Sequence, residues 1–221
     1  MRYKLPDPEF DRVATLDIET THYKPNLGEV VSIGVGVHDV GKPGDSAEYE
    51  LHHRTAPSLD NEIELIKQSL GTLNMFDADG LVSYRGRKFD IWFLKERLSL
   101  NGEENFHTDS LLPDMHIDLF EPRERECDRT GKKWPSLDEC LDSYGLPVPK
   151  TIWGGSLLTN KRFGKELGPA YIAALENGGA DKLQPVIQHY LQTDLEANFA
   201  VFYADISEQF EPHYLYSDAN F

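Results

Sequence analysis

The 221-residue sequence contains only two cysteines, Cys127 and Cys140. Two cysteines cannot build a disulfide scaffold or a cysteine-rich zinc site. We therefore expect a protein of the reducing cytoplasm in which both thiols are packing residues. A chain of this length can bury a core that is stable without disulfides or structural metals.

Long apolar runs are also missing from the sequence. The longest run, from Val30 to Val37, has eight residues and includes two glycines. A membrane-spanning helix needs about 20 apolar residues, so we expect no contact with the membrane interior. The N-terminal sequence MRYKLPDPEF lacks the hydrophobic segment of a secretory signal.

Positive charge is scarce. The chain has 22 basic residues against 38 acidic ones, which gives a formal net charge of −16. This balance argues against bulk electrostatic attraction to nucleic acid or to an anionic membrane. It still allows a nucleic-acid enzyme whose positive charge is local or is supplied by bound metal ions.

Turn residues and apolar periods predict an alternation of strands and helices in the first two thirds of the chain. In chain order we expect strands at 12–20, 30–38 and 47–52, a helix at 58–76, a strand at 81–84, a helix at 89–100, a strand at 117–120 and a helix at 136–145. Short connections rich in Gly and Pro separate the first three strands, which indicates an antiparallel meander. Ser136 and Glu139 form a capping box at the start of the last of these helices.

The remaining third is less regular. The stretch from 148 to 168 lacks periodicity and is rich in Gly, Lys and Thr, so we expect a long surface loop. A final helix is expected from Pro185, a favoured first helical residue, to about Ile206. We expect one α/β domain over 1–221, with a core at about 12–206, a mixed sheet, and a tail at 207–221 without a recognisable element.

Asp17 and Glu19 lie in the first expected strand. Alternate residues of a strand point to one face, so the two carboxylates project together while Leu16 and Ile18 face the other side. Adjacent carboxylates repel each other, and the pKa of at least one of them rises unless a cation compensates. The pattern indicates either a cation site or an edge strand with one solvated face.

Two further acids are expected to face inward. Asp90 follows a Gly-containing turn at the start of a helix, where it could also be a simple N-terminal cap. Tyr190 and Asp194 share a helical face with the apolar residues Val186, Ala197 and Val201. A buried aspartate needs a hydrogen-bond partner or a metal, so the pair indicates either a Tyr–Asp hydrogen bond or a metal ligand. Clustered oxygen ligands favour Mg²⁺ or Mn²⁺.

Taken in order, three sequence motifs resemble the three exonuclease motifs of the DEDD superfamily. They are LDIET at 16–20, FD at 89–90 and YxxxD at 190–194. HIDL at 116–119 and the run SLDECLDSYGL resemble a strand and a following helix that recur between the second and third motifs. The resemblance implies an RNase H-like fold with a mixed five-stranded sheet. It also implies 3′→5′ exonuclease activity on single-stranded ends of DNA or RNA.

The resemblance also implies roles for individual residues. Asp17, Glu19, Asp90 and Asp194 would hold two Mg²⁺ or Mn²⁺ ions, with Asp17 bridging both. Tyr190 would orient or deprotonate the water that attacks the terminal phosphodiester. The sequence is most similar to the Tyr-type branch, which includes the exonuclease domains of family B polymerases and stand-alone relatives.

The chain departs from the family pattern at two positions. His189 lies five residues before Asp194, as in the His-type branch. On a continuous helix, however, Tyr190 stacks over Asp194 while His189 is turned about 140° away, which favours Tyr190. Arg85 replaces an Asn that related sequences carry in the turn before Asp90, and its guanidinium could bind a substrate phosphate.

Several features have a structural and a functional interpretation. Trp134 and Trp153 lie near basic residues and are candidate stacking platforms for a single strand, or simply packed indoles. We interpret Asp118 as a structural hydrogen-bonding residue and the pair His52–His53 as surface residues. Alternative functions are a structure-selective endonuclease on the same fold and a non-catalytic nucleic-acid-binding module. The oligomeric state is open.

Overall fold

The computed structural model describes all residues, 1–221. Its centre is a five-stranded sheet in the order β3-β2-β1-β4-β5. The strands are β1 (Arg12–Thr20), β2 (Val30–Asp39), β3 (Glu48–His53), β4 (Gly80–Ser83) and β5 (Met115–Asp118). The first three form an antiparallel meander, and β4 and β5 run parallel to β1. The predicted mixed five-stranded sheet is confirmed.

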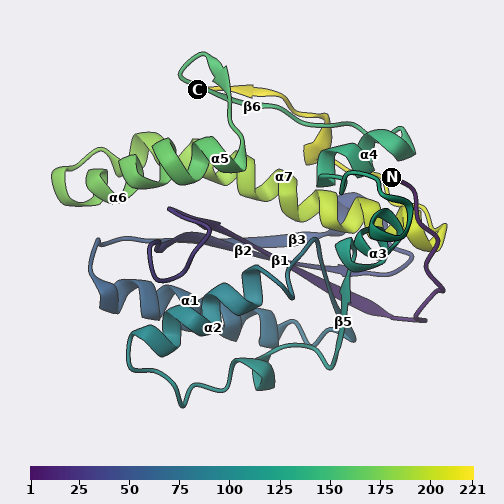
Figure 1. Cartoon of the computed structure of the whole chain (residues 1–221), viewed down its shortest axis with the longest axis horizontal. Helices are drawn as coiled ribbons and strands as arrows, with labels where there is room; N and C mark the ends of the chain where they lie inside the picture. The colour runs from purple at the N-terminus through teal and green to yellow at the C-terminus, as the bar shows by residue number, and fades with distance from the viewer.

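Helices cover both faces of the sheet (Figure 1). On one face lie α1 (Leu59–Met75) and α2 (Asp90–Leu100), and on the other lies the 27-residue helix α7 (Ala180–Ile206). Leu16 and Ile18 pack with the apolar residues of α1 and α2. The alternation along β1 therefore turns Asp17 and Glu19 towards α7, as the strand period predicts.

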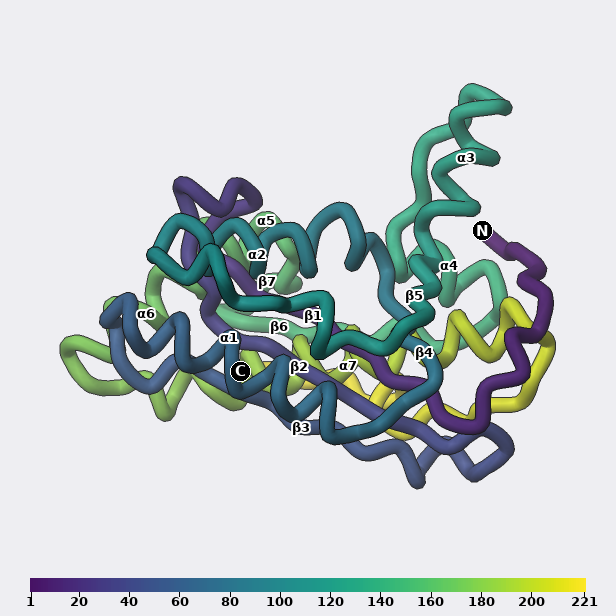
Figure 2. Tube along the Cα trace, turned by 90° about the horizontal axis from the view of Figure 1, so that it is seen from below, coloured from purple at the N-terminus to yellow at the C-terminus, as the bar shows by residue number.

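Strand β5 begins and ends two residues earlier than expected, because a helix that the sequence did not reveal follows it. This helix, α3 (Phe120–Thr130), projects from the rest of the molecule (Figure 2). Its buried face includes Arg123. Because a charged residue occupies this core position, the sequence of α3 lacks the apolar periodicity that would predict a helix. Helix α4 (Leu137–Tyr144) follows, with the predicted capping box of Ser136 and Glu139.

The prediction of a surface loop at 148–168 is wrong. The region holds β6 (Thr151–Trp153), β7 (Ser156–Leu157), α5 (Asn160–Arg162), a π-helical turn (Phe163–Leu167) and the start of α6 (Gly168–Asn177). Gly154 and Gly155 both adopt positive φ values, which allows the tight β6–β7 turn. Phe163 and Leu167 are fully buried in a cluster with Val31, so these elements cover one end of the sheet.

Helix α7 begins at Ala180, and the predicted start at Pro185 is wrong. Gly178 and Gly179, with φ values of 85° and 99°, lead into the helix. Pro185 is exposed within the second turn and lacks an N–H, so the carbonyl of Asp181 loses its helical donor on the solvent side. None of the helices is both long and apolar enough to cross a bilayer.

The final residues pack onto α7 and β6. Strand β8 (Ala219–Asn220) pairs in parallel with β6. The buried carboxylate of Glu196 accepts hydrogen bonds from the backbone N–H groups of His213 (2.8 Å) and Leu215 (2.7 Å). The chain also contains three short 3-10 helices, at Gly44–Ser46, Thr108–Leu111 and Tyr214–Tyr216.

Gly34 sets the distance between the sheet and α7. It lies opposite Asp17 in the β1–β2 register, and a Cβ atom there would lie 2.6 Å from Leu195 Cδ1 and 2.9 Å from Leu191 Cγ. We expect Gly34→Val to destabilise the protein by about 1–3 kcal/mol in urea unfolding, because α7 must move outward. In contrast, Gly71→Ala, in an open position of α1, should stabilise it by roughly 0.5–1 kcal/mol. Wild-type stability for Gly34→Val would contradict this account.

Candidate active site

Three carboxylates meet between the sheet and α7. Asp17 and Glu19 come from β1 and Asp194 comes from the middle of α7. One carboxylate oxygen from each lies within 4.8 Å of the other two. The register between β1 and β2 shifts between Glu19 and Thr20, so the strand is irregular where it leaves this group.

Asp90 approaches the same place from the start of α2. It is 3 % exposed and belongs to the first helical turn, but the helix has no side-chain cap. The carboxylate lies beside Gly86, where an added Cβ would be 3.3 Å from Asp90 Oδ2. Asp90 is not a member of the close group of three, yet its charge adds to the burial that raises the pKa values of Asp17 and Glu19.

Asp17, Glu19, Asp194 and the neighbouring Asp90 form the acidic group. Their carboxylates accept no hydrogen bond and form no ion pair within the chain. Other buried or half-buried acids are fully satisfied: Glu62 pairs with Arg97 and Arg54, Asp205 pairs with Arg123, and backbone N–H groups bind Glu196 and Asp118. Uncompensated acids at this one position are costly, because a buried charge needs a partner. The four carboxylates therefore lower the stability of the folded chain when no cation is bound.

Burial is the largest cause that raises the pKa of each of the four acids, and their mutual repulsion adds to it. A divalent cation between them would relieve both effects. Hard cations such as Mg²⁺ and Mn²⁺ prefer carboxylate oxygens, so the donor set fits such an ion.

Tyr190 lies one helical turn before Asp194. Its hydroxyl donates a hydrogen bond to Oδ1 of Asn160 at 2.5 Å, and its ring stacks on Phe163. Burial raises the pKa of Tyr190, and the charges of Asp194 and Glu19 add to this effect. His189 instead binds the hydroxyl of Thr151 (2.7 Å) and the backbone carbonyl of Ser217 (3.0 Å), both outside the acidic group.

Sequence reasoning missed two residues near the site. Asn160 falls in the stretch expected to be a loop, where the only local signal is the N-cap residue Thr159 before a short helix. Asp138, in the first turn of α4, adds a negative charge that raises the pKa values of Asp194 and Tyr190. No sequence motif distinguishes Asp138 from other acids at helix starts.

Asp118 fixes the turn between β4 and α2. Its carboxylate accepts hydrogen bonds from the backbone N–H groups of Arg85 (2.9 Å), Arg87 (3.1 Å) and Phe120 (3.0 Å). The predicted structural role of Asp118 is confirmed. Gly86 is required in this turn, because a Cβ would lie 2.2 Å from Ser83 Oγ.

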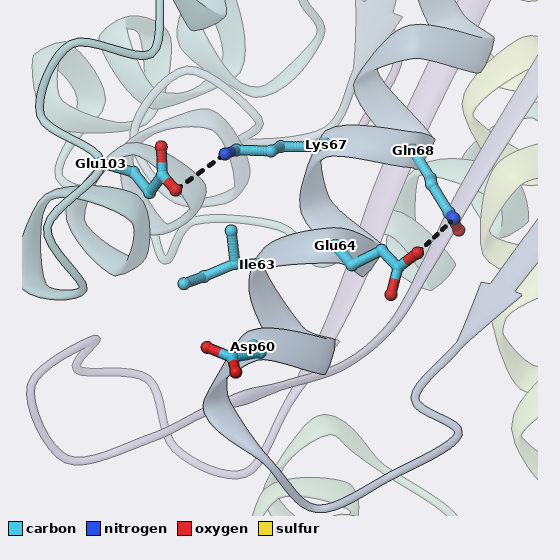
Figure 3. Close-up of a pocket in the computed structure, with 6 residues that line it drawn as sticks. All are labelled: Asp60, Ile63, Glu64, Lys67, Gln68 and Glu103. Carbon is cyan, nitrogen blue, oxygen red and sulfur yellow. Dashed lines mark hydrogen bonds and ion pairs between the residues drawn. The ribbon is translucent and has the colours of Figure 1, made fainter.

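Two surface depressions lie away from the acids. One, of about 380 Å³, borders α1, and its polar groups pair with each other: Lys67 with Glu103 and Gln68 with Glu64 (Figure 3). The other, of about 440 Å³, is lined in part by His52 and His53. Both histidines were expected at the surface, and the structure places them half-buried in the wall of this depression, with His53 Nδ1 2.8 Å from Ser32 Oγ. Neither depression contains a set of catalytic groups.

Comparisons with known proteins agree with the fold. A family model of the RNase H superfamily matches residues 14–147, more than half of the chain. The structure is similar to that of the family B DNA polymerase from the hyperthermophilic archaeon Pyrobaculum calidifontis, with a TM-score of 0.59 and 18 % sequence identity. The similarity covers 93 % of this chain but 25 % of the polymerase, so this chain spans about a quarter of that length. No curated protein matches the sequence. The predicted RNase H-like fold is confirmed.

Proposed function

Because the chain belongs to the RNase H superfamily, we propose that it is a metal-dependent 3′→5′ exonuclease of the DEDD type. Its substrate is the single-stranded end of DNA or RNA. The observation that carries the proposal is the acidic group: the close carboxylates of Asp17, Glu19 and Asp194, with Asp90 beside them, have no partner in the chain and occupy the positions of the three sequence motifs. Nucleases with this fold use divalent metals, and the carboxylates fit such ions.

In this proposal Asp17, Glu19, Asp90 and Asp194 hold two Mg²⁺ or Mn²⁺ ions. Bound divalent ions supply positive charge for the scissile phosphate and lower the pKa of water. The chain needs this charge, because its own net charge of −16 repels a polyanion. Arg85, exposed in the turn before Asp90, contributes a guanidinium that can bind a phosphate of the substrate.

Tyr190 positions the attacking water. Its O–H is donated to Asn160, so the phenolic oxygen is free to accept a hydrogen bond from water. Burial raises the pKa of Tyr190 above the ordinary value near 10, which supports a role in positioning the water rather than in taking its proton. These contacts support the Tyr-type branch.

We expect Tyr190→Phe to lower kcat on the order of 100-fold, because the water loses its orientation. Asn160→Ala should lower kcat about tenfold by releasing the tyrosine hydroxyl, and should have less than a twofold effect in the Tyr190→Phe background. Steady-state kinetics of the two single variants and the double variant measure this coupling. A larger loss for His189→Ala than for Tyr190→Phe would instead favour the His-type branch.

The proposed function is tested with end-labelled single- and double-stranded DNA and RNA, with Mn²⁺, Mg²⁺ or EDTA. We expect stepwise shortening of single strands from the 3′ end, only with metal, and no degradation of strands with a blocked 3′ end. Internal cleavage of the blocked strands would identify an endonuclease. Binding of nucleic acid without hydrolysis under any of these conditions would identify a non-catalytic module.

A further inference from the structure

Arg85 has a strained backbone conformation next to the acidic group. Its φ of 70° lies in the left-handed region, which is unfavourable for a residue with a Cβ. Asp118 holds this conformation through the N–H groups of Arg85 and Arg87. Strain of this kind persists only where the surroundings impose it, and it clusters at functional sites. The same turn leads directly into Asp90, so Arg85 is rigidly placed relative to the acids.

The guanidinium of Arg85 stacks on aromatic rings instead of pairing with an acid. Its central carbon lies 4.2 Å from the ring centroid of Phe120 and 5.7 Å from that of Trp134. No carboxylate lies within ion-pair distance of it, whereas the neighbouring Lys88 pairs with Glu124. Arg85 is also exposed, so its positive charge is available to an anionic ligand.

Trp134 is both fixed and accessible. Its indole N–H donates a hydrogen bond to Asp128 Oδ1 at 2.7 Å, and Phe120 packs against it edge-to-face with ring centroids 5.8 Å apart. The side chain is nevertheless 43 % exposed. An aromatic ring that is already held in place loses little conformational entropy when a planar ligand stacks on it.

From these contacts we propose that Arg85 and Trp134 form a stacking platform for single-stranded nucleic acid. A base stacks on the exposed face of Trp134. Arg85 binds the adjoining phosphate at the β4–α2 turn, which leads directly into Asp90. The proposal rests on the proposed nuclease function for its ligand class. It goes further by specifying that the nucleic-acid strand passes over the β4–α2 turn and the segment that follows α3. Stacking on an aromatic side chain contributes roughly 5- to 150-fold in affinity per base.

The test measures binding of a fluorescein-labelled oligodeoxythymidylate to the full chain in EDTA by fluorescence anisotropy, with the Asp194→Asn substitution in every protein to prevent degradation. We expect Trp134→Ala and Arg85→Ala each to weaken binding roughly 5- to 150-fold, and Trp134→Phe to weaken it less. Trp92→Ala is the matched control, because Trp92 is 41 % exposed and points away from the buried side of α2, where Asp90 lies. It should bind like the parent protein.

Quenching of tryptophan fluorescence by the unlabelled oligonucleotide gives a second measurement. We expect the quenching to disappear with Trp134→Ala and to persist with Trp92→Ala. Equal affinity of the Trp134→Ala and parent proteins would overturn the platform, and so would an equal loss with Trp92→Ala. Trp134-dependent binding in the Asp194→Asn background, together with no hydrolysis by the wild-type protein, would overturn the proposed nuclease function alone. Metal-dependent hydrolysis together with Trp134-independent binding would overturn the platform alone.

Discussion

Asp194→Asn is expected to abolish hydrolysis and, in the same protein, to stabilise the metal-free fold. The substitution removes one of the mutually repelling charges of the acidic group, and no cation of the chain compensates this charge. Removing electrostatic repulsion at a functional site commonly increases the free energy of unfolding by about 0.5–2 kcal/mol. Loss of a metal ligand should reduce kcat by at least about 1,000-fold, because the bound metal contributes several kcal/mol to the transition state.

Thermal unfolding with and without Mn²⁺ separates the two effects. At a hundredfold excess over its dissociation constant, one bound ion adds about 2.7 kcal/mol of stability. For a chain of this size, that raises the wild-type Tm by roughly 5–10 °C. We expect Asp194→Asn to lose this shift while its metal-free Tm rises. Asp181→Asn, an exposed change on the same helix, should preserve the shift. An equal Mn²⁺ shift in wild type and Asp194→Asn would exclude the metal site.

The second large effect concerns the buried ion pair of Arg123 and Asp205. Both side chains are 0 % exposed, and both oxygens of Asp205 accept hydrogen bonds from the guanidinium. Arg123 also donates to the carbonyl of Met1 at 3.0 Å, and Tyr144 donates to Asp205, so the pair joins α3, α4, α7 and the N-terminal segment. Asp205→Ala should cost about 3–5 kcal/mol, because it leaves the buried guanidinium unpaired.

Urea unfolding measures this cost, and the chain contains a matched control. Arg129 pairs with Glu126 on the same helix, but its side chain is 71 % exposed. Arg129→Ala should therefore change stability by less than about 1 kcal/mol. Replacing both members of the buried pair, with Arg123→Met and Asp205→Leu, should recover most of the stability that Asp205→Ala loses. A cost below 1 kcal/mol for Asp205→Ala would show that the pair is not a structural anchor.

Elements with a clean local pattern were predictable from the sequence. The alternation of β1 and the turn residues around β2 specify the meander, and the capping box of α4 marks its start. Elements whose pattern depends on tertiary partners were not. Helix α3 can be recognised in the sequence only when Arg123 is counted as a core residue. Arg123 can be buried because its charge is paired with that of Asp205, which is distant in the sequence. Pro185 marks no helix start, because two glycines before Ala180 already provide the entry.

The candidate site was predictable in composition and less so in geometry. The strand period placed Asp17 and Glu19 on one face, and the helix period placed Tyr190 over Asp194. The expected inward-facing positions suggested that these residues meet Asp90 in one core, and the resemblance of the ordered motifs to a known family supported that prediction. Asn160 was not predictable, because its contact with Tyr190 depends on a hydrogen bond between segments 30 residues apart.

The assembly of the acidic group has a consequence for the order of folding. Asp17 and Glu19 lie on the first strand, whereas Asp194 lies on the last long helix, so the proposed metal ligands come together only when α7 docks on the sheet. Contacts between such distant segments form slowly. A refolding intermediate in which the sheet is complete but α7 is undocked should therefore not bind Mn²⁺ at this site. If these residues bind metal as proposed, we expect Mn²⁺ affinity to appear in a refolding experiment when α7 docks, and added Mn²⁺ to favour the docked state by mass action.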